Sequence, residues 1–141
     1  MALVAGAVAV AGLGSAWLYG GREHRTDSPL ERRVREFWDA KIDGDLAKAY
    51  SLEAASQTGE VDLTGYVRKR SAAVKYLDYD IKSVDERDEK ANVEIAFTYE
   101  FRYPRGGDLR STSHLRETWM KLNGTWYRET KTGPAPLAAT R

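Results

Sequence analysis

The chain has 141 residues with 22 basic and 21 acidic side chains, so its formal net charge is only +1. That balance argues against a nucleic-acid role driven by bulk charge. Because there is no cysteine and there are only two histidines, disulfides and thiolate sites are excluded and a multi-histidine metal site within one chain is not expected. We therefore expect no cofactor, no metal and no nucleic-acid partner.

The first 20 residues carry no charged side chain. A helix over residues 2–19 would be about 27 Å long, just short of the roughly 30 Å hydrocarbon core of a bilayer. This predicts a single-pass transmembrane anchor over residues 1–20 and a protein located at the cell membrane. Two alternatives remain open, namely a secretory signal cleaved near residues 14–16 and a buried helix of a soluble protein.

The expected anchor consists mostly of small residues. Ala7, Ala11 and Ser15 stand four apart and Gly12 adjoins them, a small-xxx-small pattern typical of packed membrane helices. We therefore expect the anchor to contact transmembrane helices of other subunits. The arginines that follow, beginning at Arg22, favour a cytoplasmic domain, whereas a cleaved signal or signal anchor favours the other side, so the side stays open.

After an expected linker over residues 21–28, the chain predicts one domain over 29–130 and a flexible tail over 131–141. Ser28, Pro29 and Glu31 form the start signal of a helix with a capping box. Apolar residues then recur at three- and four-residue spacing up to about residue 43: Leu30, Val34, Phe37, Trp38 and Ile42.

Gly44 is expected to end the first helix, and Asp45 to cap a second, short one. A third helix is expected over residues 63–74. From residue 75 onward the apolar period changes to two, which predicts strands. The strands are separated by a loop at 85–89, a hairpin loop at 104–108 and a type I′ turn at Asn123 and Gly124. The expected fold class is therefore α+β, with about three helices packed on an antiparallel sheet of about four strands.

Several segments together resemble the NTF2-like superfamily, which includes SnoaL-like proteins. They are Phe37-Trp38-Asp39-Ala40, Gly44-Asp45, Ala49-Tyr50 and the closing segment 117–127. The resemblance covers residues 29–130 and implies a cone whose curved sheet wraps the first helix, with a pocket at the open end and frequent dimerisation through the sheet. Because such domains include enzymes as well as non-enzymatic accessory domains, the resemblance does not settle the function.

Enzymes of this kind need a carboxylate base in an apolar pocket and hydrogen-bond donors for an oxyanion. The nearest candidates for a pocket are Asp39, Tyr50, Tyr66 and Tyr99, with Glu117 as a further carboxylate. No spacing brings them to one point, so we assign no catalytic residue and do not favour an enzyme. The aromatic row that contains Tyr99 is also what a buried core requires.

The opposite face of the expected sheet is charged. His114 lies in mid-strand, and Glu94 and Glu100 are expected to face Arg110 and Arg116 in a cross-strand ladder. A general-base role for His114 would need one of these carboxylates as its partner. The ladder is the simpler interpretation, and the same face is a candidate docking surface.

We therefore expect a non-catalytic accessory or assembly subunit of a membrane complex that docks through its extramembrane domain. The alternative is a membrane-tethered ligand-binding protein or SnoaL-like enzyme that uses the cone pocket. A homodimer formed through the sheet is a further expected partner arrangement.

Overall fold

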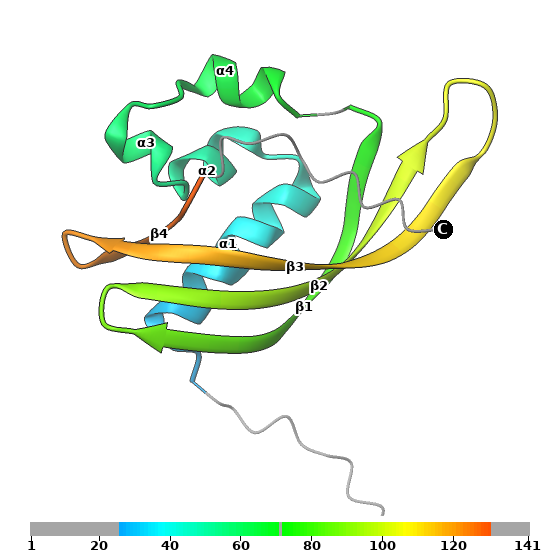
Figure 1. Ribbon diagram of the computed structural model, residues 1–141. Coiled ribbons are helices and arrows are strands. Elements are labelled where there is room, and N and C mark those ends of the chain that lie inside the picture. The colour runs from blue at the N-terminus through cyan, green and yellow to red at the C-terminus, as the bar shows by residue number, and fades with distance from the viewer. Residues whose placement is uncertain (1–25, 71, 131–141) are drawn as a thin grey trace, which may run out of the picture.

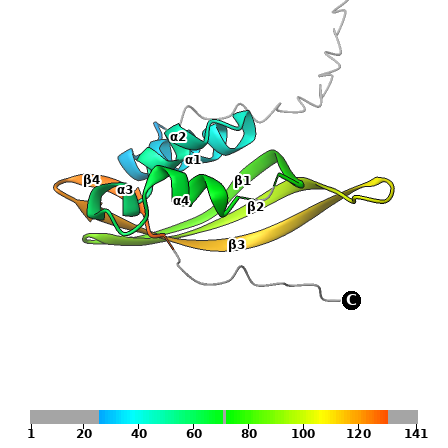
Figure 2. The ribbon, with the colours of Figure 1, turned by 90° about the horizontal axis from the view of Figure 1, so that it is seen from above.

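The computed structural model describes residues 26–70 and 72–130. In this part of the chain, helices α1 (Pro29–Asp43), α2 (Leu46–Ser51), α3 (Ala55–Thr58) and α4 (Leu63–Arg68) precede four strands. The strands are β1 (Val74–Arg87), β2 (Lys90–Arg102), β3 (Asp108–Leu122) and β4 (Thr125–Arg128). They form one antiparallel meander in the order β1-β2-β3-β4, as Figure 1 shows. The helices all lie on one face of this sheet (Figure 2).

The expected fold class is wrong in its first element, the transmembrane helix. None of the helices between residues 26 and 130 is long and apolar enough to span a membrane. The longest, α1, has 15 residues and carries charged side chains, whereas a span needs about 20 mostly apolar residues. The segment 1–20 and its proposed packing residues Ala7, Ala11, Gly12 and Ser15 lie outside the described residues, as do most of the linker and the tail.

The helices of the domain also differ from expectation. The third expected helix, over 63–74, ends at Arg68, and residue 74 already belongs to the sheet because Val74 pairs with Phe101. An additional helical turn, α3, occupies part of the polar stretch after α2. It ends at Gly59, whose φ of 76° is the left-handed conformation that favours glycine.

The first helix begins and ends as its sequence predicts. The hydroxyl of Ser28 accepts a hydrogen bond from the Glu31 backbone at 3.2 Å, and the Glu31 carboxylate accepts one from the Ser28 backbone at 2.9 Å. Gly44, with a φ of 74°, closes the other end. These caps fix the length of α1 and therefore the position of the residues in its last turn.

The core lies between α1 and the inner face of the sheet. Trp38 is 2% exposed and packs against the rings of Tyr76, Tyr79 and Phe97, with centroid distances of 5.2–5.9 Å. Trp119 is fully buried and packs edge-on against Phe37, with ring centroids 6.1 Å apart. The space between α1 and the middle of the sheet is thus filled by the protein's own aromatic side chains.

Candidate functional site

Two glutamates lie in this core, Glu53 at 0% and Glu117 at 2% exposure. Arg128 joins them, because its Nε donates to Glu117 Oε1 at 2.7 Å and its Nη1 donates to Glu53 Oε1 at 3.1 Å. Burial opposes the charge of Arg128, but the attraction of Glu117 and then of Glu53 raises its pKa above the ordinary value. Both buried carboxylates therefore share one guanidinium.

Backbone pairing holds Glu53 next to Arg128. The segment between α2 and α3 runs along the edge strand β4, where the Ala54 N–H donates to the Arg128 carbonyl at 2.7 Å and the Arg128 N–H donates to the Leu52 carbonyl at 2.8 Å. This places residues 53 and 128 as a parallel β-bridge. The edge of the sheet is thereby covered, and the two charged side chains are brought together.

Further groups contact both carboxylate oxygens of Glu53. The Tyr66 hydroxyl donates to Oε1 at 3.2 Å, the Thr130 hydroxyl donates to Oε2 at 3.0 Å, and Arg70 Nη2 lies 3.5 Å from Oε1. Burial and the negative charge of Glu53 raise the pKa of Tyr66, so this phenol stays protonated as a donor. A second guanidinium, that of Arg70, thus supports this carboxylate.

Glu117 is held by aromatic donors. Its Oε2 accepts from the indole N–H of Trp38 at 3.4 Å and from that of Trp119 at 3.2 Å. The two indoles and Arg128 together satisfy both carboxylate oxygens. We call Glu53, Glu117, Arg70 and Arg128 the charge network.

Lys41 is a further cation beside this network. It lies in the last turn of α1, is 8% exposed, and its Nζ stands 4.3 Å from the ring centroid of Tyr76 and 5.8 Å from that of Phe37. Among the described residues it has no hydrogen-bond or ion-pair partner. Burial, followed by repulsion from Arg70 and Arg128, lowers the pKa of Lys41 to about 7.

A cavity of about 520 Å³, which we call the lysine cavity, opens beside this amino group. It lies between the end of α1, the start of α2, α4 with the residues after it, and β1. Its lining is Lys41, Gly44, Leu46, Val67, Lys69, Arg70, Ala72, Val74 and Tyr76. Three of these side chains are basic, and no acidic residue of the described chain lines it. The other walls are aliphatic or aromatic.

A second cavity of about 360 Å³ adjoins the first and shares Lys41 and Tyr76 with it. Its lining contains both acidic and basic side chains, including Asp43, Glu100 and Arg102. Lys41 thus borders both cavities. Only in the lysine cavity are all the charged residues of the lining basic.

The structure does not bring the four expected pocket residues together. Asp39 is exposed on α1, where it accepts a hydrogen bond from the Tyr79 hydroxyl at 3.0 Å. Tyr50 and Tyr66 do meet, with ring centroids 5.4 Å apart, but the Tyr50 hydroxyl is bound to the Val61 carbonyl at 2.6 Å. Tyr99 packs beside Phe97 in the aromatic row of β2, with ring centroids 5.8 Å apart.

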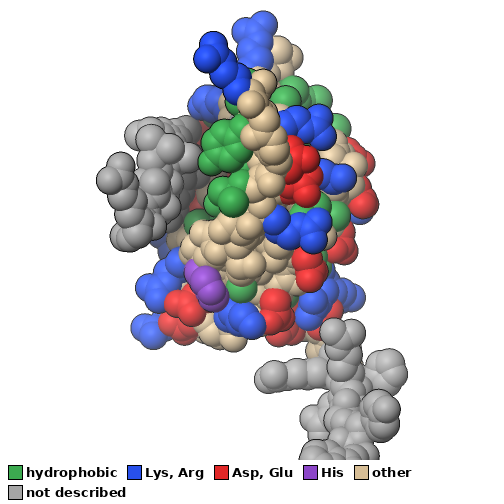
Figure 3. Space-filling view, turned by 90° about the vertical axis from the view of Figure 1, so that its right-hand side faces the viewer, with side chains coloured by type: hydrophobic (Ala, Val, Ile, Leu, Met, Phe, Trp, Pro, Cys, Tyr) green, Lys and Arg blue, Asp and Glu red, His purple; other side chains and the backbone are tan. Residues whose placement is uncertain are grey.

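The candidate docking residues lie together on the outer face of the sheet. Arg116 Nη2 donates to Glu94 Oε1 at 2.7 Å, and Arg110 Nη2 lies 3.6 Å from Glu100 Oε2. His114 is exposed opposite Ala96, and its side chain has no hydrogen bond with the other described residues. Figure 3 shows basic, acidic and histidine side chains interspersed on the side of the molecule that it displays. Within the described part of the chain, no carboxylate is hydrogen-bonded to the His114 side chain.

Four key residues of the site were missed in the sequence: Lys41, Glu53, Arg70 and Arg128. A signal existed for Lys41, because the apolar positions 30, 34 and 37 of α1 continue at 41 on the same helix face. For Glu53 and Arg70 the local sequence gives no such signal. Glu53 reaches the core through its backbone bridge to Arg128 of β4, and Arg70 reaches it through its ion pair with Glu53. Both are tertiary contacts.

No protein family and no curated protein matches this chain. Among solved structures, it is similar to a SEC-C motif-containing protein from Rhodopseudomonas palustris, with 23% identity, 75% of this chain and 80% of that chain covered, and a TM-score of 0.55. It is more distantly similar to TerC co-crystallised with polyporic acid (15% identity, coverage 72% and 89%, TM-score 0.46). The association domain of Caenorhabditis elegans CaMKII is comparable (17% identity, coverage 70% and 87%, TM-score 0.41). These likenesses concern the fold alone, and the NTF2-like resemblance stays a prediction.

Replacing Arg128 tests the charge network. Arg128→Met leaves Glu117 without a cation and Glu53 with only Arg70, so we expect the free energy of unfolding to fall by about 3–5 kcal/mol. Urea denaturation measures this. The matched control is Arg116→Met on the exposed ladder, for which we expect a much smaller loss because solvent screens that pair. Similar losses for the two variants would show that the buried network does not stabilise the fold.

Replacing Lys41 tests its burial without a partner. Below about pH 7 Lys41 is protonated in both the folded and the unfolded chain, so the folded protein bears the full cost of burying the charge. Between about pH 7 and the ordinary lysine value of 10.5, the unfolded chain holds a proton that the folded chain lacks. The cost of Lys41 to stability therefore disappears as the pH rises through this window. We expect Lys41→Met to raise the free energy of unfolding by more than about 1 kcal/mol at low pH, with a gain that shrinks at alkaline pH.

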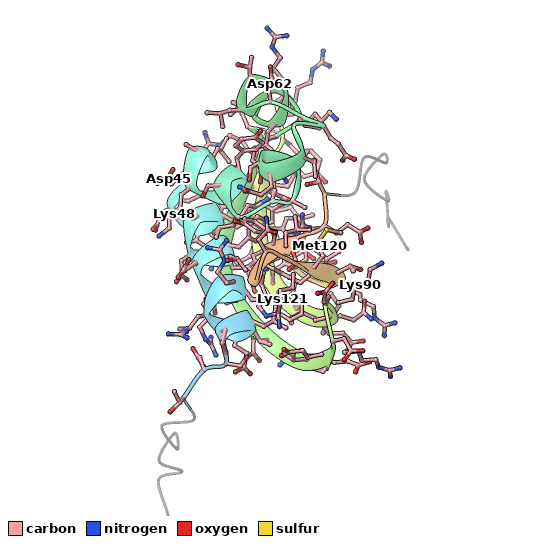
Figure 4. The ribbon with its side chains drawn as sticks, turned by 90° about the vertical axis from the view of Figure 1, so that its left-hand side faces the viewer. Asp45, Lys48, Asp62, Lys90, Met120 and Lys121 are labelled. Carbon is pink, nitrogen blue, oxygen red and sulfur yellow. The ribbon has the colours of Figure 1, made fainter. Side chains whose placement is uncertain are left out.

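The control for this experiment is Lys48→Met, because Lys48 is exposed on α2. Figure 4 shows Lys48 at the outer edge of the helices. Denaturation curves at several pH values should show no comparable gain for the control. A Lys41→Met variant that is less stable than the parent at acidic pH would contradict the account of this lysine.

Proposed function

We propose that this domain binds a small organic anion with an apolar body in the lysine cavity. The observation that carries the proposal is the lining of this cavity, in which Lys41, Lys69 and Arg70 supply positive charge and no acidic side chain among the described residues opposes them. A ligand with a carboxylate or a similar group would complement this lining. Its apolar part would contact Leu46, Val67 and neighbouring walls.

The size and composition of the cavity support a small molecule. Its volume of about 520 Å³ lies within the range of roughly 300–1,000 Å³ usual for ligand pockets. Such pockets combine mostly apolar walls with a few polar groups that orient the ligand. Here the group that would orient the ligand is the Nζ of Lys41. It lies over the ring of Tyr76 and has no hydrogen-bond acceptor among the described residues.

The charge network, which adjoins the cavity at Arg70, also supports the proposal. Arg70 is tied to Glu53, and its Nε is buried with no hydrogen-bond partner in the described chain. The carboxylates of the network are already paired with Arg128 and Arg70, so Lys41 has no ion-pair partner of its own among the described residues. A bound anion would supply the missing negative charge.

The binding test uses benzoate as the probe and benzyl alcohol as its neutral counterpart. Because the anion favours the protonated form of Lys41, benzoate affinity should fall as the pH rises above about 7, the pKa of Lys41. Lys41→Met should weaken benzoate binding at least about tenfold, the effect expected when a charged partner is lost. Isothermal titration calorimetry measures both effects.

In this test Lys48→Met is the matched control and should bind benzoate like the parent. Benzyl alcohol should bind more weakly than benzoate and without the pH dependence. The proposal fails if benzoate and benzyl alcohol bind equally, or if the affinity for benzoate does not change in Lys41→Met.

A second candidate function is the accessory subunit expected from the sequence. A separate observation favours it: the outer face of the sheet is exposed along the ladder of Glu94, Glu100, Arg110 and Arg116, and the described helices all lie on the other face. A patterned charged face of this kind suits a protein partner with complementary charges. We propose that this face, rather than the cavity, would carry such an interaction.

The swapped pair Glu100→Arg with Arg110→Glu tests the docking proposal. The exchange keeps the cross-strand attraction, so stability should change by less than about 1 kcal/mol, while the charge pattern presented to a partner is reversed. Crosslinking in cells should yield a heterologous crosslink with the parent chain and lose it in the swapped variant. An unchanged pattern, or crosslinks only between copies of this chain, would count against docking through the ladder.

A further inference from the structure

The amino group of Lys41 has the surroundings of a nucleophile. It is 8% exposed, borders two adjoining cavities, and lies 4.3 Å from the centroid of the Tyr76 ring. A structural lysine that is this buried normally has a carboxylate or carbonyl partner. None is present among the described residues, so no group in this part of the chain engages the nitrogen lone pair of the neutral amine.

The same surroundings keep part of the lysine population neutral at physiological pH. A lysine becomes nucleophilic when it is desolvated in an apolar pocket or lies beside another cation. Both conditions hold for Lys41, because burial first and then Arg70 and Arg128 lower its pKa to about 7. Exposed lysines of this chain, such as Lys48 on α2 and Lys90 at the start of β2, lack this burial.

We propose that Lys41 forms a reversible imine with small aldehydes or ketones that carry an anionic group and enter through the lysine cavity. The inference rests on the proposed ligand site, because the charged lining selects the anionic group. It goes beyond that function by assigning covalent chemistry to one nitrogen.

The reaction needs no reagent beyond the carbonyl compound. The lone pair of Lys41 Nζ forms a bond to the carbonyl carbon, and the π electrons of the C=O bond move to oxygen. A proton passes from nitrogen to oxygen to give the carbinolamine. The nitrogen lone pair then forms the C=N bond as the C–O bond breaks, and the oxygen leaves as water after taking up a second proton. One water is released for each imine, and no oxidation or reduction occurs.

The flanking side chains fit the two ends of such a substrate. Arg70 and Lys69, in the same lining, would face its anionic group. The protonated imine is a cation, and the rings of Tyr76 and Phe37 already lie within 5.8 Å of Nζ. Aromatic faces stabilise a cation at this range.

The pH dependence of the reaction is set by Lys41 together with the titratable and charged groups on every element around it. These are Asp43 on α1, Glu53 after α2, Lys69 and Arg70 after α4, Tyr76 and Lys75 on β1, Glu100 and Arg102 on β2, Glu117 on β3 and Arg128 on β4. Of these, Arg70 and Arg128 disfavour the ammonium, while Glu53 and Glu117 favour it. The rate of imine formation should rise with pH and level off above about 7.

The test uses the full chain, 4-carboxybenzaldehyde as the probe and sodium cyanoborohydride to reduce the imine to a stable amine. Peptide mass spectrometry then locates the modified lysine. At pH about 7 we expect modification of Lys41 to exceed that of Lys48 and Lys90 at least about tenfold, because only Lys41 is buried and lies beside other cations. Lys41→Met should lose this adduct, whereas Lys48→Met should keep it.

Three further measurements separate the possible outcomes. Circular dichroism and urea denaturation establish that Lys41→Met is folded. Binding of benzoate, which cannot form an imine, is measured on the same samples. Adducts spread over the exposed lysines with none enriched at Lys41 would overturn the proposal. If benzoate still binds in a Lys41-dependent manner, the imine fails and the ligand site stands; if benzoate does not bind either, both fail.

Discussion

The structure depends on the pairing of two carboxylates inside an aromatic core. An unpaired ionised carboxylate is too costly to bury, so Glu53 and Glu117 require cations and donors close by. Arg128 bridges both at 3.1 and 2.7 Å, and Arg70 reaches Glu53 at 3.5 Å. These ion pairs connect Glu117 of β3 and Arg128 of β4 with Glu53, which lies between α2 and α3. Through Glu53 they also connect with Arg70, which follows α4. A single buried network therefore fixes the relative positions of elements that are far apart in the sequence.

The network also determines the character of Lys41. Its carboxylates are engaged by guanidiniums, indoles and hydroxyls, so they do not pair with a third cation. Lys41 therefore lies beside the network with its charge opposed by burial, Arg70 and Arg128. Such a residue lowers the stability of the fold. Residues that lower the free energy of unfolding are typical of sites that act on a ligand, and a bound anion beside Lys41 would raise that free energy again.

Much of the architecture follows from local sequence rules. The capping box at Ser28, the αL glycine at residue 44 and the I′ turn at Asn123 are all present, because each depends on neighbouring residues alone. The expected transmembrane helix is not among the described helices. The third helix proved shorter than expected, because pairing of Val74 with Phe101 ends the helical segment early. A partner strand that is distant in sequence overrode the local periodicity.

The site was less predictable than the fold, for a related reason. Tyrosines and an aspartate were selected by their chemistry, yet Asp39 faces solvent and the hydroxyl of Tyr50 is bound to a carbonyl. Side-chain alternation does place Glu117 inward, on the same face of β3 as Trp119. The approach of Glu53 to Arg128 is set by the backbone bridge to β4, which no single segment encodes. Sequence patterns thus indicated which faces are buried but not which charges meet there.

The most direct test of this account is the pKa of Lys41 in the folded protein, followed by the chemical shift of its side-chain carbon next to the amino group in an NMR pH titration. With the charge network paired and Lys41 left beside it, the titration midpoint should be about 7, and it should move upward when benzoate is added. A midpoint near the ordinary value of 10.5 would show that the amino group is solvated or paired, and would contradict the account.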